Sequence, residues 1–134
     1  MSGIKALDVL LKNMNPKLSD EEYVFCTIQT VKDNFVSELN PICTFQEDEG
    51  LTVVVEKLVA LEANLQFNEV FRKITLHVHS SLEAVGLTAA VSTALTNNGI
   101  SANIIAAYYH DHVFVPTSKS DIALKVLKTI AKEG

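Results

Sequence analysis

The four histidines of the 134-residue chain fall into two His-x-His pairs, His77 with His79 and His110 with His112. Alternate residues of a strand share one face, so each pair should point its two imidazoles the same way. Converging imidazoles can bind zinc, nickel or copper, and they can also form a pH-sensitive interface or a polar layer between subunits. Two such pairs are only a weak metal signature. We name these four residues as metal candidates but expect a structural or interface role, with no metal and no cofactor.

A run of three acidic residues, Glu47-Asp48-Glu49, is the second group with chemical potential. Its simplest interpretation is a solvated hairpin tip, and the alternative is the wall of a pocket for a basic ligand, beside Glu83. Ser80 and Ser81 lack the strained elbow motif of a serine hydrolase, and no Gly-rich phosphate loop is present. We therefore expect that the protein is not an enzyme.

Composition excludes further classes of function. The formal net charge is −5, and Arg72 is the only arginine, so the clustered basic residues that bind nucleic acid are missing. No apolar run is long enough to span a bilayer, and the first 14 residues do not resemble a signal peptide. We expect a cytoplasmic protein without a nucleic-acid or membrane partner, in which Cys26 and Cys43 are free thiols.

The stretch from residue 71 to residue 116 organises the chain. Residues 71–79 alternate apolar and polar side chains, which predicts a half-buried strand. A helix with one apolar stripe should follow from Leu87 and end at Gly99, which suits the left-handed position of a helix cap. Two short strands joined by His110-Asp111-His112 and a final helix complete the predicted order β-α-β-β-α.

The first half predicts fewer regular elements. A helical stripe runs up to Met14, residues 17–22 read as a polar connector, and residues 23–28 read as a strand. Residues 42–45 and 51–55 predict a hairpin with Gly50 in its turn. The helix predicted over residues 57–65 should turn three leucines inward, namely Leu58, Leu61 and Leu65.

Three motifs in this order resemble the ACT domain: Val85-Gly86-Leu87 before a helix, Gly99-Ile100-Ser101 before a strand, and the strand Val113-Phe114-Val115. The resemblance covers roughly residues 71–131. It implies an α+β, ferredoxin-like fold, with helices on one face of an antiparallel sheet, in a module that usually binds amino acids. The chain is most similar to small bacterial proteins with two ACT-like halves and mostly unknown function.

We accordingly expect an N-terminal half over residues 1–65, without a full helix between its first two strands, and a C-terminal ACT domain over residues 66–134. The C-terminal half has no residues left for a fourth strand. Unpaired backbone groups at a sheet edge must be covered. We therefore hypothesise that residues 23–29 fill the place beside residues 71–79.

The resemblance also implies a ligand site at the turn into the helix. The matching positions are Ser81, Glu83, Gly86, Leu87 and Ser101. Glu83 departs from the uncharged amide of serine-binding ACT modules, so it would repel a carboxylate and suit an amino or guanidino group. The alternative is a tight turn with a helix cap and no ligand.

By function, the resemblance implies a small regulatory module that senses an amino acid or a related metabolite through pairing or partner contacts. We expect a homodimer, since ACT modules usually pair and the sequence offers apolar surface from Tyr108, Tyr109, Phe114 and from three alanines, Ala102, Ala106 and Ala107. The alternatives are a ligand-free structural or protein-interaction module and a histidine metal protein.

Overall fold

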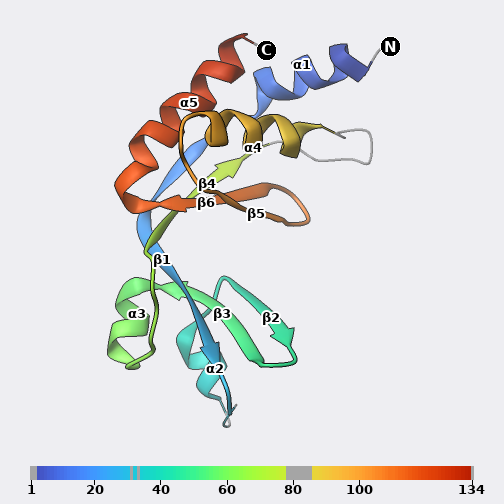
Figure 1. The fold of residues 1–134 in the computed structure, drawn as a ribbon. Coiled ribbons are helices and arrows are strands. Elements are labelled where there is room, and N and C mark those ends of the chain that lie inside the picture. The colour runs from blue at the N-terminus through green and yellow to red at the C-terminus, as the bar shows by residue number, and fades with distance from the viewer. Residues whose placement is uncertain (1–2, 31, 33, 78–85, 134) are drawn as a thin grey trace. The chain divides into compact units, whose positions relative to one another are not determined.

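The computed structural model describes residues 3–30, 32, 34–77 and 86–133 (Figure 1). Its helices are α1 (Gly3–Asn13), α2 (Phe35–Leu39), α3 (Lys57–Glu62), α4 (Leu87–Asn97), the 3-10 turn η1 (Thr117–Lys119) and α5 (Ser120–Glu133). Its strands are β1 (Lys17–Ile28), β2 (Cys43–Glu47), β3 (Gly50–Glu56), β4 (Phe71–Leu76), β5 (Asn103–Ala106) and β6 (Asp111–Pro116). The fold is α+β, as predicted.

Contacts between residues divide the chain into two compact units. We call residues 1–20 with 72–134 the terminal unit, because it holds both chain ends, and residues 21–71 the middle unit. Strand β1 contributes its first residues to the terminal unit and the rest to the middle unit. The sequence halves 1–65 and 66–134 stay a prediction.

The terminal unit has the strand order β1-β4-β6-β5, with its helices on one side of the strands (Figure 1). This is the ferredoxin-like order, and β1 occupies the place of the fourth strand, so the hypothesis of a strand supplied by the N-terminal half is confirmed. The predicted residues were wrong, because Tyr23 to Ile28 pair with β3 in the middle unit. β1 begins at Lys17, and Ser19, from the predicted polar connector, makes the contacts to β4.

Leucines of α1 and Met14 pack into the same core as α4 and α5. This core buries branched side chains of β4 and β6 against the helices, as a sheet with one covered face requires. Its fully buried members are Met14, Ile74, Leu76, Leu87, Val91, Leu95, Val113, Val115, Ala123 and Leu127. On α5, Ala123 and Leu127 take the buried positions, and Ile122 is 55% exposed.

The end of α4 confirms the predicted stop. Gly99 has a φ of 69°, and its N–H donates to the Thr96 carbonyl. The N–H of Ile100 donates to the Leu95 carbonyl at 3.0 Å, which completes a Schellman motif. Ile100 and Leu95 both lie in the core, so the cap also holds the chain where β5 begins.

The hairpin between β5 and β6 turns earlier than predicted. Ala106 pairs with Asp111, and the N–H of Ala107 donates to the His110 carbonyl, so the turn is formed by residues 107–110. Asp111 and His112 belong to β6, and Asp111 is only 2% exposed. The expected turn at His110-Asp111-His112 is therefore wrong, because the pairing register continues to Asp111.

The middle unit has the strand order β2-β3-β1. Both pairs are antiparallel, with Tyr23 opposite Glu56 in one and Cys43 opposite Val54 in the other. A second core of Val24, Cys26, Ile28, Leu39, Val53, Val55 and Ala60 packs α2 and α3 on this sheet. The hairpin prediction is confirmed, as is the absence of a full helix between the first two strands, since α2 has five residues.

The inward face of α3 was predicted wrongly. Leu58 is 71% exposed and Leu61 is 52% exposed, whereas Ala60 is fully buried. The helix ends at Glu62, so only six residues are helical and the small side chain of Ala60 permits close packing on the sheet. Leu58 and Leu61 lie on the exposed side, whereas Leu65, which follows the helix, is partly buried and packs against the core as predicted.

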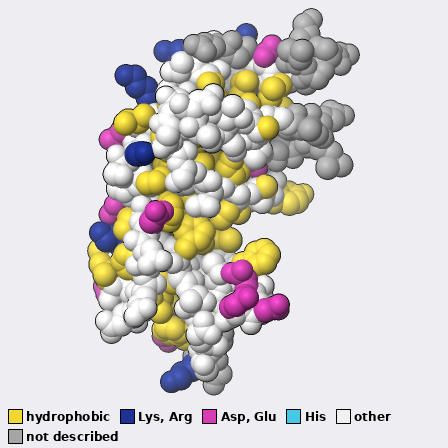
Figure 2. All heavy atoms as spheres, in the orientation of Figure 1, with side chains coloured by type: hydrophobic (Ala, Val, Ile, Leu, Met, Phe, Trp, Pro, Cys, Tyr) yellow, Lys and Arg dark blue, Asp and Glu magenta, His cyan; other side chains and the backbone are white. Residues whose placement is uncertain are grey.

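Several large hydrophobic side chains are exposed. Tyr108 and Tyr109 lie in the β5–β6 turn with exposures of 89% and 62%, and Phe45 on β2 is 69% exposed. Phe114, predicted to contribute to an interface, is buried at 2% exposure and is not available for one. Figure 2 shows acidic side chains gathered over the β2–β3 hairpin, next to hydrophobic ones. In the described part of the chain, no helix has the length and hydropathy needed to cross a membrane.

Candidate functional site

The turn into α4 is the site that the sequence predicted for a ligand. Gly86 immediately precedes the helix with a φ of 109°, and its carbonyl accepts the N–H of Ala90 at 2.8 Å. A Cβ at Gly86 would lie 3.8 Å from Cδ2 of Leu7, an ordinary contact, so the backbone conformation rather than lack of space favours glycine here. Leu7 lies on α1, which therefore packs beside this turn.

The predicted ligand residues are only partly described. Ser81 and Glu83 lie outside the described residues. Leu87 is 1% exposed and packs in the core, so it fixes the helix rather than presenting a group to a ligand. Ser101 is exposed just before β5. The site assignment stays a prediction.

Three of the four histidines gather where β4 and β6 lie side by side. The rings of His77 and His110 have centroids 4.9 Å apart, and those of His110 and His112 are 6.5 Å apart. The two His-x-His pairs therefore meet through these three residues, while His79 lies outside the described residues. Nδ1 of His77 donates to the Asn15 carbonyl at 2.9 Å, which ties the segment between α1 and β1 to the end of β4.

The environment of His112 favours its neutral form. Nδ1 of His112 lies 3.0 Å from Oγ1 of Thr75 on β4. Burial lowers the pKa of His112, and the positive charges of Lys73, His110 and His77 lower it further, against an opposing effect of Asp111. Among the described residues, no group of three His, Cys, Asp or Glu side chains has an arrangement that could hold a metal ion.

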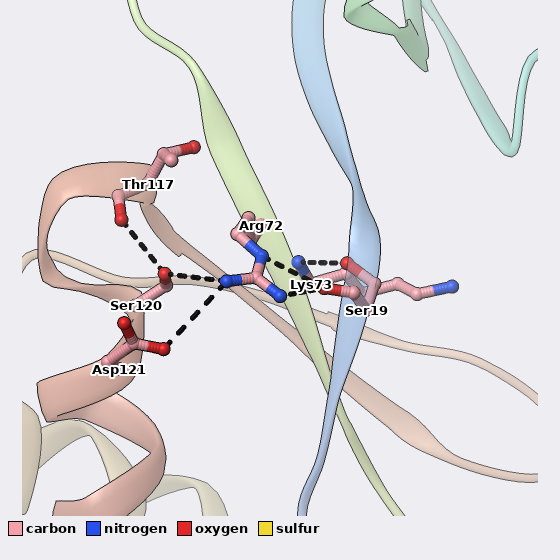
Figure 3. A network of polar contacts seen from close by, with 6 residues as sticks. All are labelled: Ser19, Arg72, Lys73, Thr117, Ser120 and Asp121. Atoms are coloured by element: carbon pink, nitrogen blue, oxygen red, sulfur yellow. Dashed lines mark hydrogen bonds and ion pairs between the residues drawn. The ribbon is translucent and has the colours of Figure 1, made fainter.

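Arg72 forms a polar network that the sequence did not indicate (Figure 3). It lies on β4 between β1 and the start of α5. Its Nε and Nη2 both donate to the Ser19 carbonyl, the first at 2.9 Å, and its Nη1 donates to Oγ of Ser120 at 3.4 Å. Oγ of Ser19 accepts the N–H of Lys73 at 3.0 Å, so contacts run in both directions between β1 and β4.

The charge of Arg72 is only weakly compensated. Its Nη1 lies 3.9 Å from Oδ1 of Asp121, whose side chain is 93% exposed, so the ion pair itself contributes little. The main role of Arg72 is to satisfy a backbone carbonyl of the strand that completes the sheet. The signal that could have found it was its uniqueness, since it is the only arginine of the chain.

Comparison with protein families identifies the fold. A model of the ACT domain matches residues 2–72, and a second model of the ACT domain matches residues 66–129. The chain belongs to the ACT-domain family. Its two matches make it a tandem ACT protein, as the sequence predicted. No curated protein sequence gives a significant match to this chain.

Solved structures agree with the ACT assignment. A protein of unknown function from Vibrio cholerae, described as a possible transport protein, is 51% identical with a TM-score of 0.87, over 97% of this chain and 99% of that one. A protein from Agrobacterium tumefaciens is 13% identical with a TM-score of 0.72, over 87% of each chain.

The ligand-free regulatory subunit of aspartate kinase from Thermus thermophilus is also similar to the ACT protein. It is 13% identical with a TM-score of 0.60, over 86% of this chain and 95% of that one. At this identity the similarity shows the shared fold and nothing more. ACT domains are typically regulatory rather than catalytic.

Proposed function

We propose that this ACT protein is a cytosolic regulatory module that binds an amino acid or a related small metabolite and acts through pairing or partner contacts. The observation that carries the proposal is the turn into α4, where a left-handed Gly86 precedes a full-length helix in a ferredoxin-like unit. The first N–H groups of a helix have no intrahelical partners, and together with the helix dipole they suit an anionic group of a ligand.

In this proposal, Ser81, Glu83 and Ser101 hold the polar groups of the ligand, and Gly86 with Leu87 shapes the turn. Glu83 would favour a ligand with an amino or guanidino group near it. Binding would shift the population of a paired state, without chemistry, so we propose no catalytic activity and no cofactor.

A homodimer is the second part of the proposal. β5 ends the strand order of the described terminal unit, and the adjacent turn exposes Tyr108 and Tyr109. Aromatic side chains at this exposure are typical anchors of protein interfaces. Light scattering after size exclusion should give twice the chain mass, and a monomer at micromolar concentration would contradict the dimer.

The test of ligand binding is a thermal-shift scan against the twenty amino acids. A ligand at about one hundred times its dissociation constant adds about 2.7 kcal/mol, which raises the Tm of a domain of this size by several degrees. The shift should be stereospecific and should be lost in Ser101→Ala and Glu83→Ala. Ser118→Ala removes another exposed serine, in η1, and should keep it.

The exposed tyrosines favour one alternative, a protein-interaction module without a ligand. A flat amino-acid scan together with a dimer that Tyr108→Ser weakens would favour this alternative and contradict the sensor.

A further inference from the structure

The middle unit has an open surface pocket, called the cavity below, that the ACT ligand site does not explain. Its volume is about 480 Å³, within the range of small-molecule sites. Strands β1, β2 and β3 and the segment after α3 supply its walls, and all of its lining residues belong to the middle unit. They are Phe25, Cys26, Thr27, Glu47, Thr52, Gln66, Phe67 and Asn68.

Strand register brings the polar side chains of the cavity together. Thr52 on β3 lies opposite Thr27 on β1 and opposite Phe45 on β2, so these three side chains share one face of the sheet. Glu47 follows Phe45 by two residues on β2 and therefore lies on the same face. Close approach of the hairpin to β1 depends on Gly50. A Cβ there would lie 2.9 Å from Oγ1 of Thr27 and 3.0 Å from the Ile28 carbonyl.

A hydrogen bond fixes the carboxylate of Glu47. Oγ1 of Thr52 donates to Oε1 of Glu47, which holds one carboxylate oxygen toward β3. Each carboxylate oxygen accepts more than one hydrogen bond, so this contact orients the group and leaves acceptor capacity for a ligand. Glu47 thus differs from a charge at a hairpin tip, because a second side chain of the cavity positions it.

The charge and aromatic character of the cavity select one class of ligand. Among the described residues that line it, Glu47 is the charged side chain, and none is Lys or Arg. Cys26 alternates with Thr27 on β1, so its thiol belongs to the core on the other face of the sheet and adds no charge to the cavity. Phe25 and Phe67 add two phenyl rings, and Phe25 is held edge-on against Phe71 with centroids 5.3 Å apart. A carboxylate beside aromatic rings suits an organic cation, through ion pairing and cation–π attraction.

The charge of the middle unit acts in the same direction. Residues 21–71 hold ten acidic residues and two lysines, a net charge of −8, and the remaining residues hold six acidic and nine basic residues, a net charge of +3. These two values add to the −5 of the whole chain. Figure 2 shows the acidic side chains over the β2–β3 hairpin, where Glu47 ends β2. A negative field of this kind raises the local concentration of cations.

We propose that this cavity binds a small organic cation, a primary amine or a guanidinium group on a compact apolar body. Glu47 pairs with the cationic group, the hydroxyl of Thr27 and the amide oxygen of Gln66 accept its remaining hydrogen bonds, and Phe67 packs on the apolar body. This site is independent of the amino-acid site proposed at α4, because it lies in the other unit.

Titration of the ¹⁵N-labelled full chain with benzylamine and with agmatine tests the proposal. Saturable shifts are expected for backbone amides of β1, for residues 47–52 and for residues 66–68. Benzyl alcohol has the same shape as benzylamine without the charge, and it should bind at least about tenfold more weakly, since a charge-assisted hydrogen bond is lost. Equal binding of the alcohol, or no saturable shift with either cation, would overturn the proposal.

Two variants with the same change of net charge separate the site from the general field. Glu47→Gln should weaken benzylamine binding at least about tenfold, and Glu49→Gln, outside the cavity lining, should change it less than twofold. Equal weakening in both variants would show attraction by the hairpin charge alone and would overturn the site. Thr52→Val removes the hydroxyl that orients Glu47 and should give an intermediate loss; unchanged binding would contradict the positioning role.

The same titration keeps the two proposals apart. Ser101→Ala should leave benzylamine binding intact, because Ser101 lies in the terminal unit. Saturable shifts confined to α4 and residues near Ser101 would overturn the cation cavity and support the ligand turn instead. Shifts confined to the middle unit, with a flat amino-acid scan, would support the cavity and count against the sensor.

Discussion

Helix α4 follows β4 in the terminal unit, and helix α2 follows β1 in the middle unit. The two helices differ in length and in how they begin and end. Helix α4 has eleven residues, begins after Gly86 and ends in a Schellman motif. Helix α2 has five residues and lies between two asparagines in left-handed conformation, Asn34 with φ 62° and Asn40 with φ 49°. A helix of one turn buries few side chains and has a small dipole. The middle unit therefore keeps the ferredoxin-like strand order but, among its described residues, has no counterpart of the turn at Gly86.

The two units therefore differ in the chemical groups and the net charge at their surfaces. The terminal unit carries the family-type turn, the histidine cluster and a net positive charge. The middle unit carries no histidine, a strongly negative charge and a cavity with an oriented carboxylate. A tandem protein can in this way present two chemically different surfaces on one repeated fold.

The largest expected effect is the loss of unfolding free energy when a helix leucine is replaced by alanine, compared between the two units. Leu95→Ala in α4 removes a fully buried side chain and should cost about 2–5 kcal/mol of unfolding free energy, through lost burial and a cavity. Leu61→Ala in α3 changes a side chain that is 52% exposed and should stay within about 0.5 kcal/mol. Urea unfolding measures both, and equal losses would contradict the inverted face of α3.

A smaller loss of unfolding free energy is expected when a polar contact is removed, and it should differ between the two units. Arg72→Lys loses the two donors that converge on the Ser19 carbonyl and should cost about 1–3 kcal/mol, since hydrogen bonds from a charged donor to a half-buried carbonyl are lost. Lys57→Met in the middle unit breaks a pair 3.9 Å from Glu22 with both side chains 36% exposed, and should cost at most about 1 kcal/mol. Comparable losses in urea unfolding would show that the network in Figure 3 is dispensable.

The smallest effect is a pH dependence confined to the terminal unit. The pKa of His112 is lower in the folded protein than its ordinary 6.5, so the unfolded chain binds its proton first as the pH falls. The stabilising contribution is complete above pH 6.5 and is lost as the pH falls from there through the folded pKa. Hydrogen exchange should show the loss on β4 and β6.

His112→Gln, which keeps a hydrogen-bonding side chain beside Thr75, should flatten this dependence. The middle unit, which has no histidine, should show none of it over the same range. An equal acid loss in both units, or one unchanged in the variant, would assign the effect to other groups.

Local signals predicted much of the fold. The sequence predicted β4, α4 and the Schellman end of α4 correctly. Each of these depends on residues close together in the chain: the alternation before residue 77, the apolar stripe of α4 and the cap at Gly99. The hairpin around Gly50 has the same local origin. The motifs around Gly86 and Gly99 were enough to suggest the ACT family, which two family models then confirmed.

Only the tertiary structure decided which faces are buried and which strands are neighbours. Leu58 and Leu61 have the spacing of a core stripe, yet Ala60 takes the buried place because α3 packs closely on its sheet. Residues 17–20 look like a connector, and pairing with β4 makes them a strand, held by Arg72. The cavity around Glu47 joins residues up to 43 positions apart, from Phe25 to Asn68, so no local pattern could have indicated it. The sequence by itself determined the local elements and the family, and long-range packing determined their burial, because burial depends on neighbours that are distant in the chain.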